Sequence, residues 1–252
     1  MADYSIKHWT TATTAVGSSR DDAIEVAVNN RAAVRQAIID AVEAQGVRVR
    51  TRSAWNAQSP ATSPEQDWGY TKIAIHHAGN SFSCSADGAT EMRKVEATDL
   101  GRFGQVSYHY AIDCKGVIYE ALDIRYKGSH IELGNTGAIG IVLLANLSLP
   151  GEAMDDGPGI ARKYRDSGLK AAAAELVGVT KDAFDFGYDV PTEPQIESAS
   201  VLCKTLASYF NITVVGGHRE FANKLGTSRA CPGAYGLVIS NMLRRELNAS
   251  AP

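Results

Sequence analysis

The sequence predicts an α/β fold, built as a single domain with a central mixed β-sheet flanked by helices. Short runs rich in β-branched residues are interspersed, without strict alternation, with longer segments of helical periodicity. The 252 residues are 44% hydrophobic and 21% charged, as is usual for a folded domain. This composition excludes a mostly disordered chain, a collagen-like fibre and a coiled coil, and no apolar run is long enough to span a membrane.

The charge balance predicts which classes of partner the protein binds, and the N-terminal sequence predicts where it is synthesised. Lys and Arg number 25 against 28 Asp and Glu, a net charge of -3. We therefore expect no nucleic-acid partner and no membrane partner. Residues 1–22 lack a basic start followed by an apolar core, so synthesis in the cytoplasm without an ordinary signal peptide is expected.

The chain is predicted to divide into an N-terminal extension, residues 1–47, and a domain of residues 48–252. Residues 1–20 are polar and predicted to be loosely ordered. A helix is predicted over residues 21–45, ending at Gly46. Residues 150–190 interrupt the domain with turn-rich stretches around an alanine-rich helical segment, and are predicted to be an insertion.

Within the domain, strands are predicted where β-branched or continuous apolar residues cluster, at residues 70–76, 104–112, 116–120, 138–145 and 212–215. Helices are predicted over residues 84–101, 192–210 and 235–247. Thr192, with Gln195 three residues later, has the spacing of a capping box, which places a helix start there.

Three residue groups suit a catalytic zinc ion. His76 stands at the end of a predicted buried strand, His218 follows another strand, and Cys231 precedes a proline. Two imidazoles and a thiolate match the preference of zinc, and three protein ligands leave a fourth position for water. Four cysteines, Cys84, Cys114, Cys203 and Cys231, do not suggest a disulfide scaffold; in a reducing compartment each is a small buried residue, a metal ligand or a nucleophile.

These motifs together resemble the zinc-dependent N-acetylmuramoyl-L-alanine amidases of the phage-lysozyme and peptidoglycan-recognition-protein superfamily. The resemblance covers about residues 48–148 and 191–247. It is carried by RSAW at residues 52–55, IAIHHAG at 73–79, GQVSYHYAID at 104–113, GNTGAIGIVLLAN at 134–146, and GHRE with ACPG at 217–220 and 230–233. Val142 stands where the cytoplasmic recycling amidases carry Glu, so the phage and recognition-protein branch is the better match.

The resemblance implies zinc held by His76, His218 and Cys231. It implies that Tyr108 orients the zinc-bound water and that Arg229, where the phage enzymes have Lys, stabilises an oxyanion. The alternatives are a core tyrosine for Tyr108 and a surface salt bridge for Arg229. The resemblance also implies that His130 contacts the substrate; the alternative is that His130 is an exposed loop histidine without such a contact. His77 lies on the opposite strand face and is expected to be packed and hydrogen-bonded.

Two smaller features complete this expectation. Asn135 is expected to shape the turn that follows it through backbone hydrogen bonds. Recognition proteins often carry a paired-cysteine loop after the first metal motif. Cys84 lies in that region, and Thr90 and its neighbours offer it no partner.

The implied reaction is hydrolysis of the amide between N-acetylmuramic acid and L-alanine in peptidoglycan. A non-catalytic peptidoglycan-binding recognition module and a fold held by structural zinc are the alternatives. The substrate lies in the periplasm or cell wall, so export by a non-classical route is expected, either as an antibacterial effector or as a phage-type endolysin. Possible partners are an immunity protein or a secretion apparatus.

Overall fold

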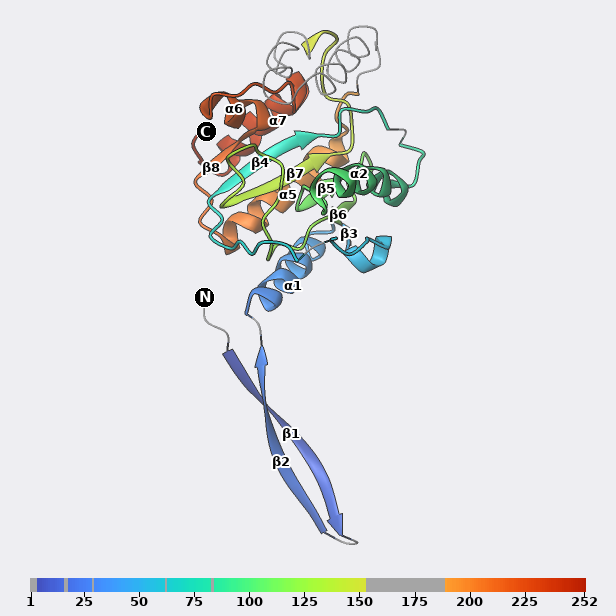
Figure 1. Ribbon diagram of the computed structural model, residues 1–252, viewed down its shortest axis with the longest axis vertical. Helices are drawn as coiled ribbons and strands as arrows, with labels where there is room; N and C mark the ends of the chain where they lie inside the picture. The colour runs from blue at the N-terminus through green and yellow to red at the C-terminus, as the bar shows by residue number, and fades with distance from the viewer. Residues whose placement is uncertain (1–3, 16–17, 29, 62, 83, 153–188) are drawn as a thin grey trace.

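A computed structural model describes residues 4–15, 18–28, 30–61, 63–82, 84–152 and 189–252. Its centre is a six-stranded mixed sheet in the order β3-β6-β5-β7-β4-β8 (Figure 1). Neighbouring strands are parallel except β5 and β6, which are antiparallel. The predicted fold class is confirmed. The strands are β3 Val49–Arg50, β4 Lys72–His77, β5 Tyr110–Ile112, β6 Ile118–Glu120, β7 Ala138–Leu143 and β8 Val214–Gly217.

Helices cover both faces of the sheet. On one face the largest apolar cluster unites Ile73 and Ile75 of β4 with side chains of α1 (Asn30–Glu43), α5 (Glu193–Tyr209) and α7 (Gly233–Glu246). The other face is covered by α2 (Gly88–Phe103) and α6 (His218–Lys224). Because side chains alternate along β4, His76 lies on the second face. A helix over 218–224 was not predicted.

The predicted capping box at the start of α5 forms in part. The side chain of Thr192 accepts a hydrogen bond from the backbone N–H of Gln195 at 3.3 Å. The Gln195 side chain donates to the carbonyl of Ile112 at 3.0 Å instead of returning to the cap. The helix start is therefore joined directly to the end of β5.

The N-terminal region differs from its prediction. β1 (Tyr4–Ala15) and β2 (Ser18–Val28) form an antiparallel hairpin that leads away from the six-stranded sheet (Figure 1). The prediction of a loosely ordered start is wrong, because residues 4–15 form β1. The prediction of a helix from residue 21 is also wrong, because residues 18–28 form β2 and the helix begins at Asn30. Ile24, Val26 and Val28 repeat every second residue, a strand period that the helical interpretation overlooked. Of the predicted insertion, residues 153–188 lie outside the described residues.

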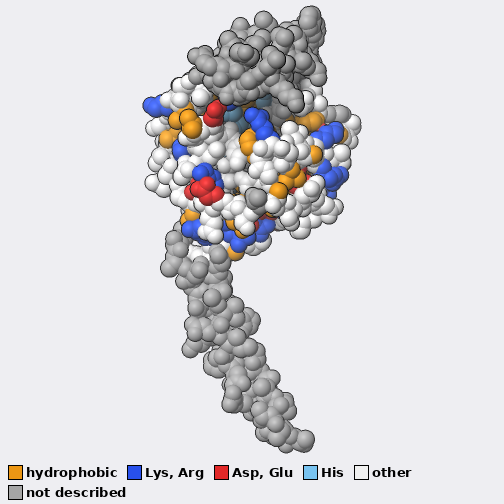
Figure 2. All heavy atoms as spheres, viewed as in Figure 1, with side chains coloured by type: hydrophobic (Ala, Val, Ile, Leu, Met, Phe, Trp, Pro, Cys, Tyr) orange, Lys and Arg blue, Asp and Glu red, His pale blue; other side chains and the backbone are white. Residues whose placement is uncertain are grey.

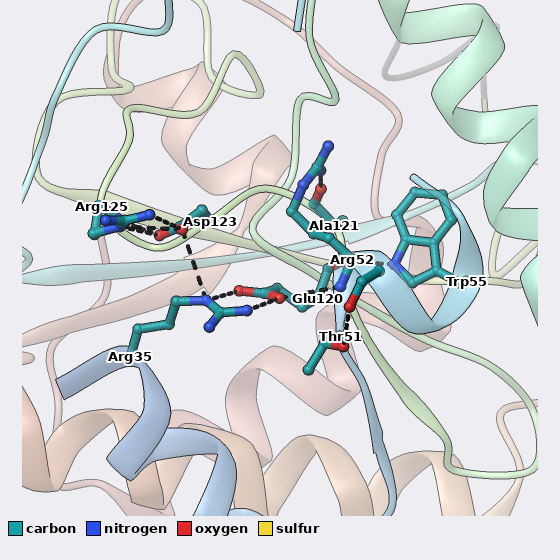
Figure 3. Close-up of polar contacts among 9 residues, drawn as sticks. Arg35, Thr51, Arg52, Trp55, Glu120, Ala121, Asp123 and Arg125 are labelled. Atoms are coloured by element: carbon teal, nitrogen blue, oxygen red, sulfur yellow. Dashed lines mark hydrogen bonds and ion pairs between the residues drawn. The ribbon is translucent and has the colours of Figure 1, made fainter. Parts of the chain in front are cut away.

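Helix α1 is fixed to the sheet by charged groups as well as by its apolar face. Arg35 makes a bidentate contact with Glu120 of β6, which also accepts from the backbone N–H of Arg52 at 3.2 Å (Figure 3). Asp123 lies 3.7 Å from Arg35 and pairs with Arg125 at 2.7 Å. This packing favours a domain start at α1; the boundary after residue 47 stays a prediction.

The RSAW motif belongs to the same network. It forms the 3-10 helix η1 (Arg52–Trp55), whose Trp55 ring N–H donates to the carbonyl of Glu120 at 2.8 Å. The Arg52 side chain donates to the carbonyls of Ala121 and Gln58. Both ends of the motif therefore hold the last residue of β6 and the residue that follows it.

We expect Arg35→Met to destabilise the fold. Glu120 is only 2% exposed, so removing the guanidinium leaves a buried carboxylate without its ionic partner, at a cost of about 3–5 kcal/mol. Denaturant titration measures this loss. The double variant Arg35→Met/Glu120→Gln should recover most of it, because no buried charge then remains. Wild-type stability of the single variant would contradict the assignment.

The cysteines also differ from expectation. Cys84 is bonded to Cys114 in the β5–β6 turn, thirty residues away in sequence. The disulfide ties the loop after β4 to this turn, and its partner lies too far along the chain for the residues around Thr90 to indicate it. Cys203 and Cys231 are free thiols.

The surface agrees with the balanced composition. On the face visible in Figure 2, Lys and Arg side chains are scattered in small groups, with Asp and Glu side chains among them. Among the described residues, no helix combines the length and the apolar character needed to cross a membrane.

Candidate metal and catalytic site

The sheet topology brings His76 and His218 together. β4 and β8 are parallel neighbours, with Ile75 opposite Gly217. Each histidine is the next residue along its strand direction, so both lie at the same edge of the sheet. His218 begins α6, where Glu220 accepts from the backbone N–H of Gly217 at 2.8 Å and fixes the turn between strand and helix.

Cys231 completes a triplet with the two histidines. One ligand atom from each of His76, His218 and Cys231 lies within 4.8 Å of the others. The Cys231 Sγ atom is 3.6 Å from His76 Nδ1. A tetrahedral zinc ion bonded at about 2.0 Å to nitrogen and about 2.3 Å to sulfur separates those atoms by about 3.5 Å. The donor set and its spacing therefore fit zinc.

The electrostatics of the triplet also suit a cation. Burial lowers the pKa of His76 well below its ordinary value, and the nearby histidines add to this effect. Burial and the cation of Arg229 lower the pKa of His218 to about 3. Both imidazoles are thus neutral, as metal ligands must be. Desolvation raises the pKa of the Cys231 thiol to about 12, so its thiolate needs a cation beside it.

Ion pairs hold the segment that carries Cys231. Arg219 donates to the carbonyl of Ala230 and pairs with Glu152 at 3.0 Å. Glu152 also accepts from the backbone N–H of Ala234 at 3.0 Å. Sequence reasoning missed Glu152, because it lies about 80 residues before the segment that it supports.

Tyr108 lies beside the triplet, and its predicted role toward a metal-bound water stays a prediction. Its ring centroid is 5.0 Å from that of His76, and burial raises the pKa of its hydroxyl. The hydroxyl therefore stays protonated and can donate a hydrogen bond, which suits an orienting role better than a basic one. The strand predicted over residues 104–112 is shorter, since β5 begins at Tyr110.

Arg229 lies near His218 and makes an ion pair. Its Nη2 is 2.5 Å from Glu132, whose side chain is 55% exposed, while Arg229 itself is 23% exposed. The pair joins the loop after His130 to the loop before Cys231. Sequence reasoning missed Glu132, and the catalytic role of Arg229 stays a prediction.

His130 is buried, with 6% of its surface exposed, and both ring nitrogens have partners within the protein. The alternative of an exposed loop histidine is therefore wrong, and the substrate contact of His130 stays a prediction. His77 accepts from the backbone N–H of Leu147 at 3.1 Å, which is the packed, hydrogen-bonded role expected for it. Asn135 accepts from the backbone N–H groups of His130 and Ile131 at 2.8 and 2.7 Å, so its side chain shapes the turn before it and not the following turn that was predicted.

Known proteins with related sequences include the Drosophila simulans peptidoglycan-recognition protein SC2. It is 31% identical over 122 residues, which are 46% of this chain and 66% of that protein. The match thus spans just under two thirds of the relative's length.

Solved structures share the fold. Drosophila peptidoglycan recognition protein SD matches with a TM-score of 0.56 and 17% identity, over 81% of this chain and 97% of that one. The amidase LysC from Clostridium intestinale gives 0.52 and 18%, over 81% and 99%. Human PGRP-IBETAC, in complex with glycosamyl muramyl pentapeptide, gives 0.50 and 17%, over 78% and 94%.

The sequence model of one protein family, described as N-acetylmuramoyl-L-alanine amidase, matches residues 67–234, which is more than half of the chain. The matched segment contains the three candidate ligands, Tyr108 and Arg229. The chain therefore belongs to the N-acetylmuramoyl-L-alanine amidase family.

Proposed function

We propose that this protein hydrolyses the amide bond between N-acetylmuramic acid and L-alanine in bacterial peptidoglycan, with zinc held by His76, His218 and Cys231. The observation that carries the proposal is the convergence of these three ligand atoms within 4.8 Å. Family membership and the muramyl pentapeptide bound by the human structural relative support peptidoglycan as the substrate class.

The positions of the side chains suggest a separate role for each in the reaction. Zinc, when bound, lowers the pKa of a coordinated water and polarises the amide carbonyl. The neutral imidazoles of His76 and His218 supply lone pairs, and Cys231 supplies a thiolate. Tyr108, protonated and next to His76, donates a hydrogen bond to the attacking water or to the oxygen that becomes negative. Arg229 provides a permanent positive charge near that oxygen, and a well-placed donor contributes about 3–4 kcal/mol.

A recognition module without turnover is the second candidate function, favoured by the similarity to recognition proteins. In the superfamily that the sequence resembles, non-catalytic members lose zinc ligands. This chain keeps all three donors in one cluster, which supports the enzyme.

Digestion of purified peptidoglycan sacculi tests the proposal. We expect free L-alanine amino termini and no new reducing sugar ends, because an amide and no glycosidic bond is cleaved. A chelator should abolish the appearance of free L-alanine amino termini, and added zinc should restore it. Binding to sacculi without release would favour the recognition module, whereas reducing ends without free amines would indicate a glycosidase.

Delivery to the cell wall stays a proposal, with a secreted antibacterial effector slightly preferred to a phage-type lysin. An immunity gene next to this one would support the effector. A neighbouring holin gene would instead identify a lysin.

A further inference from the structure

His130 occupies a site shaped for its ring. It lies on the loop before β7, and its ring packs against the backbone of Gly140 in β7. A Cβ atom added at Gly140 would lie 2.6 Å from the imidazole, and one added at Gly128 would lie 2.5 Å from it. Two glycines therefore leave the space that the imidazole fills, and Asn135 fixes the backbone on either side of the His130–Ile131 bond.

The ring nitrogens of His130 have different partners. Its Nε2 is 3.2 Å from the carbonyl oxygen of Ala138. Its Nδ1 is 3.1 Å from Nε2 of His76. A carbonyl only accepts hydrogen bonds, so the partners assign the proton of neutral His130 to Nε2 and leave Nδ1 as an acceptor.

This assignment determines the protonation of His76. Because His130 Nδ1 accepts, His76 Nε2 must carry the proton and donate it. The other nitrogen of His76, Nδ1, is then unprotonated, and it is the one that lies 3.6 Å from Cys231 Sγ. With the opposite tautomer, Nδ1 of His76 would carry a proton and could bind no metal.

We infer that His130 is a positioning residue of the metal site: through a chain from Ala138 to His130 to His76, it holds the His76 ring in the tautomer that presents Nδ1 to the ion. This role rests on the proposed metal site and differs from the substrate contact predicted from sequence. A hydrogen bond to the far nitrogen of a histidine ligand fixes ring orientation and typically contributes 10–100-fold to metal affinity.

Zinc affinity, measured by competition with a chromophoric chelator, tests the inference. His130→Asn places an amide oxygen near the Nδ1 position, so this variant should bind zinc within a few-fold of wild type. His130→Leu has nearly the same size and no acceptor, so its affinity should fall 10–100-fold. The matched control is Leu133→Ser, since Leu133 lies on the same loop and is 84% exposed; its affinity should be unchanged.

Each outcome has a separate meaning. If the wild-type chain binds no zinc, the proposed metal site itself fails. If wild type binds zinc and His130→Leu binds it equally well, the inference fails. In that case, a raised KM for a muramyl peptide in both His130 variants would show a substrate contact instead.

A measurement on the unmodified protein covers the case in which His130→Leu does not fold. Long-range ¹⁵N–¹H spectra distinguish the protonated nitrogen of each imidazole. We expect protonated Nε2 and unprotonated Nδ1 in both His76 and His130 of the zinc-loaded protein. A proton on Nδ1 of His130 would overturn the inference without any substitution.

Discussion

Cys231→Ala should abolish amidase activity and weaken zinc binding by orders of magnitude. Removing the thiol leaves two imidazole ligands, whereas catalytic zinc sites normally use three protein ligands. His76→Ala and His218→Ala should have the same effect, because their ligand atoms belong to the same cluster. Zinc content and sacculus hydrolysis measured on the same preparations check this result.

Cys203→Ala is the matched control, since Cys203 is a free thiol buried in α5, in the apolar cluster on the opposite face of the sheet from His76. It should keep both zinc and activity. Cys84→Ala and Cys114→Ala should also keep activity when folded, although each breaks the disulfide. Full turnover by metal-free Cys231→Ala would refute the ligand assignment.

The same preparations separate catalytic from structural zinc. The apolar clusters on both faces of the sheet form without the three ligands, so we expect the chelated protein to retain its circular dichroism spectrum and cooperative unfolding. Loss of the fold on chelation would instead identify zinc as a structural element.

The triplet of His76, His218 and Cys231 could be predicted from sequence because the pattern that marks each residue is short and continuous in the chain. Each ligand stands in a short motif, and two of the motifs directly follow strands. Parallel neighbours in a sheet bring such positions to one edge, as β4 and β8 do for His76 and His218. The donor chemistry and the family resemblance suggested these two residues together, and the pairing of β4 with β8 supplies the structural reason.

The surroundings of the triplet depend on loop packing, which short motifs do not encode. The pairing of Arg229 with Glu132 joins residues 97 positions apart. The contact between His76 and His130 depends on how one loop folds over β7. In the sequence, only Gly128 and Gly140 relate to the space that the His130 ring fills. Glycine occurs for many other structural reasons, so these two residues do not predict the contact.

Ambiguous periodicity explains the error at the N-terminus. In residues 23–28 the β-branched side chains of Ile24, Val26 and Val28 alternate with alanine and glutamate, while Ile24 and Val28 are also spaced as on one face of a helix. Antiparallel pairing with β1, the strand that precedes it in the chain, determines the strand. The helical pattern that remains begins only at Asn30.

Arg229→Ala should lower kcat and kcat/KM together by about a hundredfold, with zinc content unchanged. Arg229 follows α6 two residues before Cys231, so its backbone is held close to the ligands, and its charge already lowers the pKa of His218. A guanidinium cannot lose its proton, and it interacts more strongly with an oxyanion than with a neutral carbonyl. Arg229→Lys should recover much of the loss, because Lys keeps the charge.

The ion pair with Glu132 supplies the decisive comparison. If Arg229 only joins two loops, then Glu132→Gln, which removes the other half of the pair, should reproduce every effect of Arg229→Ala. Such a partly exposed pair contributes about 0–1 kcal/mol, so that role predicts a small loss of melting temperature and near-normal kcat in both variants. If Arg229 acts on the reacting amide, Glu132→Gln should keep kcat within a few-fold of wild type while Arg229→Ala loses it. A folded, zinc-loaded Arg229→Ala protein with wild-type kcat would remove Arg229 from the catalytic residues.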